Sequence, residues 1–191
     1  MPSFPDGAIG VLVDRDGTMI RDVVHLSRLD QVEVLPLVAE AIRLLRERGL
    51  KVAVITNQSA VGRGLLTEEE LLGIHRELER RLAAAGARLD GFYYCPHHPT
   101  EGLGGYRIAC DCRKPNVGLA RRAAAELKLD LGRSYVVGDQ ATDMELAARI
   151  GARGLLIQAQ PPEQAAAPAR VTVKDLWEAA NWIVRDLSEE K

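Results

Sequence analysis

Two aspartates one residue apart stand near the start of the chain, in the run Asp14-Arg15-Asp16-Gly17-Thr18. They follow the apolar stretch 8–13, which is typical of a strand buried on both faces. A carboxylate at the end of such a strand can attack an electrophile, exchange a proton with a leaving group, or bind a divalent cation. Asp14 and Asp16 are therefore the first candidates for chemistry in this sequence.

Further polar residues follow two other apolar runs. Thr56 comes directly after the run 51–55, Asp139 closely follows the strand-like run ending at Val137, and Asp143 comes four residues after Asp139. If these runs are parallel strands of one sheet, the polar residues share the edge where open α/β sheets bind ligands. Carboxylates gathered there repel one another unless a cation neutralises them, and an oxygen-only site favours magnesium. The alternative is that each aspartate is a turn residue or helix cap, which explains one of them more easily than all.

All three cysteines lie in one short segment, in which Cys95 and His97 are followed by Cys110 and Cys112. Three thiols and one imidazole are the four ligands that a closed tetrahedral zinc site needs, although the gaps are tighter than in common zinc fingers. We predict a zinc-stapled loop over about residues 95–112. The alternatives are incidental thiols in a reducing compartment, or a disulfide that leaves one cysteine over.

The elements that must position these residues alternate along the chain. Apolar, β-branched runs predict strands at 8–13, 51–55, 91–94, 134–137 and 154–157, and helical patterns fall at 37–45, 67–85, 115–129, 143–150 and 174–187. Right-handed crossovers then give a Rossmann-like α/β fold, a mostly parallel sheet with helices on both faces. We expect one domain over 1–191, a loop at 158–170, and His75 at the surface or with satisfied hydrogen bonds.

Composition narrows the classes of function. The 191 residues suit one domain, and 47% hydrophobic with 27% charged residues is ordinary for a globular protein. A net charge of −2 argues against nucleic-acid or anionic-membrane partners. The N-terminus has neither the basic start nor the apolar stretch of a signal peptide. We expect a cytoplasmic monomer that acts on a small molecule.

Four segments resemble, in order, the four motifs of the haloacid dehalogenase superfamily: Asp14-Arg15-Asp16-Gly17-Thr18, Ile55-Thr56-Asn57-Gln58-Ser59, Cys112-Arg113-Lys114-Pro115, and Gly138-Asp139-Gln140-Ala141-Thr142-Asp143. The resemblance implies a phosphatase in which Asp14 attacks phosphorus and forms an aspartyl-phosphate. It implies that Asp16 protonates the leaving oxygen and then activates the hydrolytic water.

The same resemblance implies a metal and phosphate site. Magnesium would be held by Asp14, Asp139 and the backbone carbonyl of Asp16, and Asp143 would orient a magnesium-bound water. The side chains of Thr56 and Lys114 would hold the phosphoryl oxygens, where positioning and charge stabilisation do most of the catalytic work.

The zinc loop narrows the resemblance to the D-glycero-D-manno-heptose 1,7-bisphosphate phosphatases and, more distantly, the histidinol-phosphate phosphatases. It implies His97 rather than His98 as the zinc ligand, and a zinc loop that replaces a separate cap domain and forms one wall of the active site. It implies removal of the C7 phosphate from the heptose bisphosphate. The substrate-binding residues it implies are Asp22, Thr56, Asn57, Gln58, Ser59, Arg63, Arg113 and Lys114.

Two departures bear on the substrate. The segment 19–25 is expected to contact the sugar, but only Asp22 in it matches the heptose enzymes, and Gln140 stands where those enzymes commonly have lysine. Histidinol phosphate or another small phosphomonoester is therefore the alternative substrate. A non-catalytic, zinc-stapled binding module is the alternative class, because fold alone does not fix function.

Overall fold

The computed structural model describes residues 7–23, 26, 28–158 and 171–189. Within them the chain forms one six-stranded, wholly parallel sheet with the strand order β3-β2-β1-β4-β5-β6. The strands are β1 (Gly10–Val13), β2 (Lys51–Asn57), β3 (Gly91–Cys95), β4 (Tyr135–Gly138), β5 (Arg153–Ile157) and β6 (Val171–Val173). The Rossmann-like α/β fold predicted from the sequence is confirmed. The loop predicted at 158–170 lies, apart from Gln158, outside the described residues.

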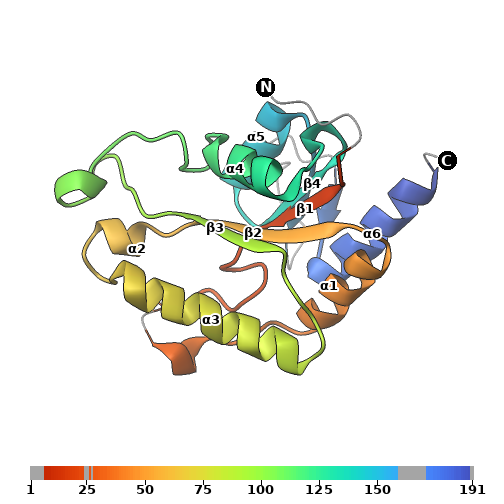
Figure 1. Ribbon diagram of the computed structural model, residues 1–191, viewed down its shortest axis with the longest axis horizontal. Coiled ribbons are helices and arrows are strands. Elements are labelled where there is room, and N and C mark those ends of the chain that lie inside the picture. Colours follow the sequence, from red (N-terminus) through yellow and green to blue (C-terminus); the bar gives the residue numbers. More distant parts are fainter. Residues whose placement is uncertain (1–6, 24–25, 27, 159–170, 190–191) are drawn as a thin grey trace.

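Helices cover both faces of the sheet (Figure 1). They are α1 (Val38–Glu47), α2 (Ser59–Gly62), α3 (Glu68–Ala84), α4 (Gly118–Leu127), α5 (Ala141–Ile150) and α6 (Leu176–Glu189). Helices α1, α3 and α6 pack on one face, and α4 and α5 on the other. A hydrophobic core lies on each face of the sheet, and successive side chains of a strand point into the two cores alternately. Val11 and Val13 pack in the core that contains α1, and Leu12 packs in the core that contains α4. A strand buried on both faces must be apolar at every position, as β1 is.

The sequence pattern located the long elements and missed the short ones. The Thr67 capping box opens α3 as predicted, with the Thr67 hydroxyl accepting from Glu70 N at 3.1 Å. Helix α4 begins at Gly118 rather than at the predicted position 115, because Gly118 N donates to Asp111 O at 2.8 Å and ties the preceding turn to the zinc loop. The three-residue strand β6 and the four-residue helix α2 were not predicted, since neither is long enough to show a period.

The order of the strands creates the place for a site. Strands β1 and β4 are hydrogen-bonded neighbours, yet the chain continues from β1 to β2 on one side and from β4 to β5 on the other. The crevice at the carboxyl ends of two such strands is where sheets of this kind bind ligands. Among the described residues, no helix is both long and apolar enough to cross a bilayer.

Candidate active site

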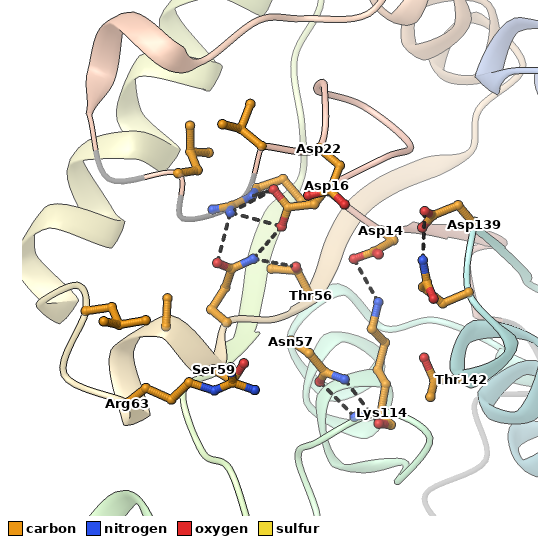
Figure 2. Close-up of a pocket in the computed structure, with 17 residues that line it drawn as sticks. Asp14, Asp16, Asp22, Thr56, Asn57, Ser59, Arg63, Lys114, Asp139 and Thr142 are labelled. Atoms are coloured by element: carbon orange, nitrogen blue, oxygen red, sulfur yellow. Dashed lines mark hydrogen bonds and ion pairs between the residues drawn. The ribbon is translucent and has the colours of Figure 1, made fainter. Parts of the chain in front are cut away.

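A cleft of about 310 Å³ opens at the carboxyl edge of the sheet (Figure 2), a volume at the lower end of the range for small-molecule sites. Its lining comes from the end of β2 and from the segments that follow β1, β2 and β4, and Lys114 comes from the segment between β3 and α4. The lining residues are Asp14, Arg15, Asp16, Asp22, Val23, Leu26, Thr56, Asn57, Gln58, Ser59, Ala60, Arg63, Leu65, Lys114, Asp139, Gln140 and Thr142.

A buried lysine stands at the centre of the cleft floor. Lys114 Nζ lies 2.8 Å from Asp14 Oδ1 and 2.7 Å from Asp143 Oδ1, and it donates to the carbonyl of Ile55 at 2.9 Å. Burial opposes the charge on Lys114, but the Asp14 and Asp143 carboxylates outweigh it and raise the pKa. The ammonium is therefore charged and fixed beside Asp14, with an orientation set by three oxygens.

Three carboxylates meet at this point. Oxygens of Asp14, Asp139 and Asp143 lie within 4.8 Å of one another. Burial raises the pKa of Asp139 and that of Asp143, and Asp14 raises both further. Asp139 Oδ1 is buried without a hydrogen-bond partner among the described residues, and Asp14 Oδ1 has the ion pair with Lys114. A buried, unpartnered carboxylate oxygen in a crowded acidic site fits a divalent cation such as magnesium.

Glycine allows the carboxylates to come this close. Gly17 has φ of +73°, a conformation that L side chains rarely adopt. A Cβ atom there would also collide with the Asp139 carboxylate, and one on Gly138 would collide with that of Asp143. The absence of a side chain at Gly17 therefore leaves room for the Asp139 carboxylate, and its absence at Gly138 leaves room for that of Asp143.

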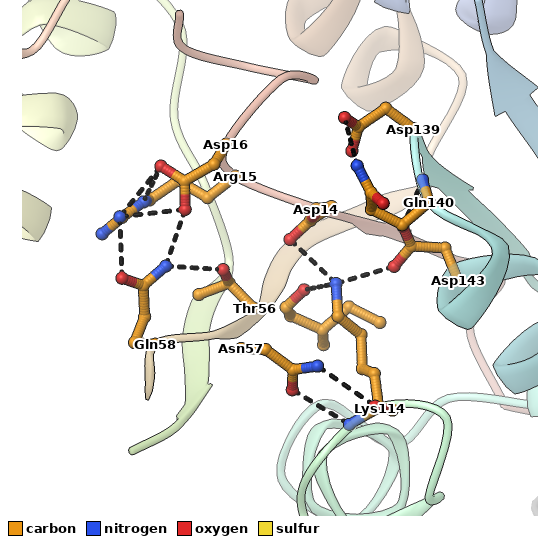
Figure 3. Close-up of polar contacts among 11 residues, drawn as sticks. Asp14, Arg15, Asp16, Thr56, Asn57, Gln58, Lys114, Asp139, Gln140 and Asp143 are labelled. Atoms are coloured by element: carbon orange, nitrogen blue, oxygen red, sulfur yellow. Dashed lines mark hydrogen bonds and ion pairs between the residues drawn. The ribbon is translucent and has the colours of Figure 1, made fainter. Parts of the chain in front are cut away.

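Asp16 points away from Asp14 and into a separate polar network (Figure 3). Its carboxylate accepts from Arg15 Nη2 at 2.9 and 3.0 Å and from Gln58 Nε2 at 2.7 Å. Gln58 Nε2 also donates to Thr56 Oγ1 at 2.9 Å. Since the Thr56 oxygen accepts this bond, its own proton is free to be donated into the cleft. Gln58, predicted to bind substrate, is fully engaged with protein groups here.

Asn57 is engaged in a similar way. Its side-chain amide donates to Lys114 O at 3.1 Å, and its oxygen accepts from Lys114 N at 3.0 Å. This pair of bonds joins the end of β2 to the loop that carries the lysine. Of the other residues predicted to bind substrate, Ser59 lines the cleft, and Arg63 lines it while pairing with Glu101 at 2.9 Å.

The zinc loop does not form a wall of this cleft, contrary to the expectation from sequence. No residue between 95 and 112 is among the lining residues, all of which lie in the described part of the chain, and Arg113 is also absent from them. Arg113 instead donates to the carbonyl of His97 at 3.0 Å. The loop packs against α2 and the N-terminal end of α3, where Leu103 N donates to Gly62 O at 2.7 Å and Tyr106 donates to Glu68 at 2.8 Å. At the rim of the cleft, Glu101 of the loop pairs with Arg63.

The four predicted zinc ligands come together. The sulfur atoms of Cys95, Cys110 and Cys112 are 3.1–3.4 Å apart, and His97 Nδ1 lies 3.6 Å from Cys95 and 3.3 Å from Cys112. Ligands at about 2.0–2.3 Å from a tetrahedral zinc ion would be roughly 3.4–3.8 Å apart. The sulfur separations are also far longer than a disulfide bond of about 2.05 Å.

The electrostatics of the cluster suit a cation. Burial raises the pKa of the Cys95 thiol and that of Cys112, so a positive charge is needed to hold both as thiolates. The neighbouring His98 turns back onto its own loop, where its Nδ1 accepts from Glu101 N at 3.0 Å. The cluster can therefore bind zinc through His97.

The segment 19–25 contacts the cleft only in part. Met19 and Ile20 have no exposed surface and belong to the hydrophobic core, so the expectation that they contact the sugar is wrong. Their burial anchors the turn that follows Asp16. Asp22 and Val23 do line the cleft, whereas residues 24 and 25 lie outside the described part of the chain.

His75 was also misjudged from the sequence. It is 4% exposed, and neither ring nitrogen has a hydrogen-bond partner among the described residues. Its ring stacks on Phe92 at 4.7 Å. The apolar face of α3 carried the signal for this burial, because position 75 falls in the same stripe as Leu71, Leu78 and Leu82.

Known proteins share this fold and are similar in sequence over most of the chain. The HAD-hydrolase-like family model matches residues 111–179. The chain is 36% identical to a D-glycero-β-D-manno-heptose-1,7-bisphosphate 7-phosphatase of Yersinia pestis (94% of this chain, 91% of the relative) and 34% identical to that of Escherichia coli K12 (94% and 90%). The crystal structure of D,D-heptose 1,7-bisphosphate phosphatase from B. bronchiseptica with magnesium and phosphate superposes with a TM-score of 0.81 at 31% identity (93% of this chain, 99% of that one). The chain is therefore a phosphatase of the HAD superfamily and belongs to the family of the heptose 1,7-bisphosphate phosphatases.

Proposed function

We propose that this enzyme removes the C7 phosphate from D-glycero-D-manno-heptose 1,7-bisphosphate and leaves the 1-phosphate. The observation that carries the phosphatase chemistry is the Asp14 carboxylate fixed 2.8 Å from Lys114 in the floor of the cleft. The choice of sugar is supported by the names of the relatives, to which the similarity extends over 94% of the chain.

In this proposal Asp14 is the nucleophile. One of its oxygens attacks phosphorus in line with the departing sugar oxygen, and the P–O bond to the sugar breaks as the Asp14–P bond forms. Lys114 and the free proton of Thr56 bind equatorial phosphoryl oxygens. Because these donors are held by protein contacts before substrate arrives, little reorganisation is needed at the moment of reaction.

Asp16 is the proposed acid and base. It gives a proton to the leaving sugar oxygen, and then takes one from the water that hydrolyses the aspartyl-phosphate. Arg15 and Gln58 hold its carboxylate at the side of the cleft. Giving up its proton in the first step leaves Asp16 as the carboxylate that the second step needs, and the proton taken from water restores the acid for the next cycle.

Asp14, Asp139 and the carbonyl of Asp16 are the proposed magnesium ligands, with Asp143 orienting a bound water. Magnesium, when bound, supplies positive charge that offsets the repulsion between the carboxylates and the incoming phosphate. Gln140 donates to Asp139 Oδ2 at 3.0 Å. This bond leaves the unpartnered Oδ1 as the oxygen for the metal.

A phosphate-release assay over a panel of substrates tests the proposal. The panel contains heptose 1,7-bisphosphate, histidinol phosphate, a hexose 6-phosphate and p-nitrophenyl phosphate, each with magnesium and with excess EDTA. We expect the highest kcat/KM for the heptose bisphosphate, and turnover that requires magnesium. A higher kcat/KM for histidinol phosphate would show that the heptose bisphosphate is not the preferred substrate. Activity that persists in EDTA would overturn the magnesium site. If no phosphate were released from any substrate, the protein would be a non-catalytic binding module instead.

We further propose that Cys95, His97, Cys110 and Cys112 bind one structural zinc ion. Protein purified without chelator should contain about one zinc per chain, and His97→Ala should lose most of it and melt at a lower temperature. The adjacent His98→Ala is the matched control, because His98 bonds only within its own loop among the described residues. Absence of zinc from the wild type, or equal loss in both variants, would contradict the assignment.

A further inference from the structure

Arg15 is buried next to the proposed acid–base residue. Its side chain is 2% exposed, and its Nε and Nη2 atoms donate to the Asp16 carboxylate at 2.9–3.2 Å. Nη2 also donates to Gln58 Oε1 at 2.9 Å. Because a planar guanidinium allows few orientations of a carboxylate that it grips in this way, the position of Arg15 determines that of Asp16.

The remaining nitrogen of this guanidinium lacks a partner. Arg15 Nη1 is buried and makes no hydrogen bond to any described residue, and the same is true of both ring nitrogens of His75. A buried donor or acceptor left without a partner is destabilising. Two such groups in the same part of the core are therefore expected to be joined by a buried water.

Contacts along β2 and β3 bring the two side chains to the same part of the core. The ring of His75 contacts Tyr94, which pairs in register with Thr56, and Gln58 bonds both Thr56 and Arg15. Burial, and after it the positive charge of Arg15, lowers the pKa of His75 to about 3. The imidazole is therefore neutral at physiological pH and has one acceptor nitrogen, whereas a guanidinium can only donate. Stacking on Phe92 at 4.7 Å and an edge contact with Tyr94 at 5.7 Å hold the ring in place.

We propose that His75 is a positioning residue for the phosphatase reaction: its ring accepts a hydrogen bond from a buried water to which Arg15 Nη1 donates, and this bridge holds Arg15 against Asp16. His75 itself does not line the cleft and acts only through its neighbours. The inference rests on the proposed function, because it assumes that Asp16 protonates the leaving group.

Leaving-group dependence tests this role. A misplaced general acid harms the release of a poor leaving group such as a sugar alkoxide, and harms the release of p-nitrophenolate much less. For His75→Phe, which keeps a ring against Phe92 and removes both nitrogens, we expect kcat/KM to fall about 10-fold or more for the best sugar phosphate. The fall for p-nitrophenyl phosphate should be less than about threefold. His75→Gln, which retains an acceptor, should recover part of the loss.

A double-mutant cycle makes the test decisive. Asp16→Asn should show the same selectivity to a greater degree, and adding His75→Phe to it should cause little further loss, because both changes act on one step. Leu82→Ala, in the same apolar stripe of α3 as His75, is the packing control and should lower the melting temperature without a selective effect. Equal losses for both substrates, or fully additive losses in the double variant, would overturn the role of His75. Absence of selectivity in Asp16→Asn alone would instead overturn the proposed role of Asp16.

If the His75→Phe variant does not fold, the double-mutant cycle is carried out with His75→Leu instead. Leucine fits the apolar stripe of α3, in which Leu71, Leu78 and Leu82 are already buried. A selective loss in a folded His75→Leu variant supports the proposal, and its absence contradicts it.

Discussion

Asp14→Asn should reduce turnover by at least about 10⁴-fold, because an amide cannot form the aspartyl-phosphate. Asp143, the other carboxylate paired with Lys114, is fully buried and does not line the cleft. The side chains have nearly the same shape, and Lys114 keeps its pair with Asp143 at 2.7 Å. The melting temperature should therefore change by only a few degrees. Phosphate release from p-nitrophenyl phosphate, with circular dichroism and thermal melting, measures both quantities.

Asp30→Asn is the matched control for this variant. Asp30 forms an exposed pair with Arg28 at 2.6 Å and is not among the cleft-lining residues, and exposed pairs contribute little. Its turnover should stay within about twofold of wild type. If Asp14→Asn kept normal turnover, Asp14 would not be the nucleophile. If it lost turnover by unfolding, the melting curve would reveal that separately.

Lys114→Met should have the largest effect on stability. The ammonium is within 2.9 Å of three oxygens, from Asp14, Asp143 and Ile55. Removing one partner of a buried ion pair leaves uncompensated charge and typically costs about 3–5 kcal/mol. For a chain of this length that corresponds to a fall in melting temperature of roughly 6–20 °C. Turnover should also be lost, since the phosphoryl group loses its principal cationic side chain.

Two further variants separate charge from packing. In Lys51→Met the lost lysine is 42% exposed and its partner Asp90 keeps Arg46, so we expect a cost of at most about 1 kcal/mol. Adding Asp143→Asn to Lys114→Met removes one of the stranded charges and should recover part of the stability but none of the activity. Chemical denaturation measures these differences. Wild-type stability in Lys114→Met would show that the lysine is not needed to balance the carboxylates.

The sequence alone determined the fold class and the acidic edge of the sheet. Alternating apolar runs and helical patterns require parallel strands, and parallel strands place their carboxyl ends together, so Asp14, Thr56 and Asp139 had to meet. The cysteine cluster was equally visible, because its ligands are close in sequence. Local spacing and one-dimensional periodicity are sufficient for conclusions of this kind.

Only the tertiary structure decided what the neighbouring side chains contact. Asn57 binds the backbone of Lys114, Gln58 joins Thr56 to Asp16, and the zinc loop packs against α2 and the start of α3 instead of lining the cleft. These contacts join residues that are 38 to 57 positions apart or depend on side-chain direction, which no local pattern encodes. The burial of His75 is a fourth case. Its place in the apolar stripe of α3 can be recognised from the sequence, but its contacts with Phe92 and Tyr94 follow only from how α3 packs on the sheet.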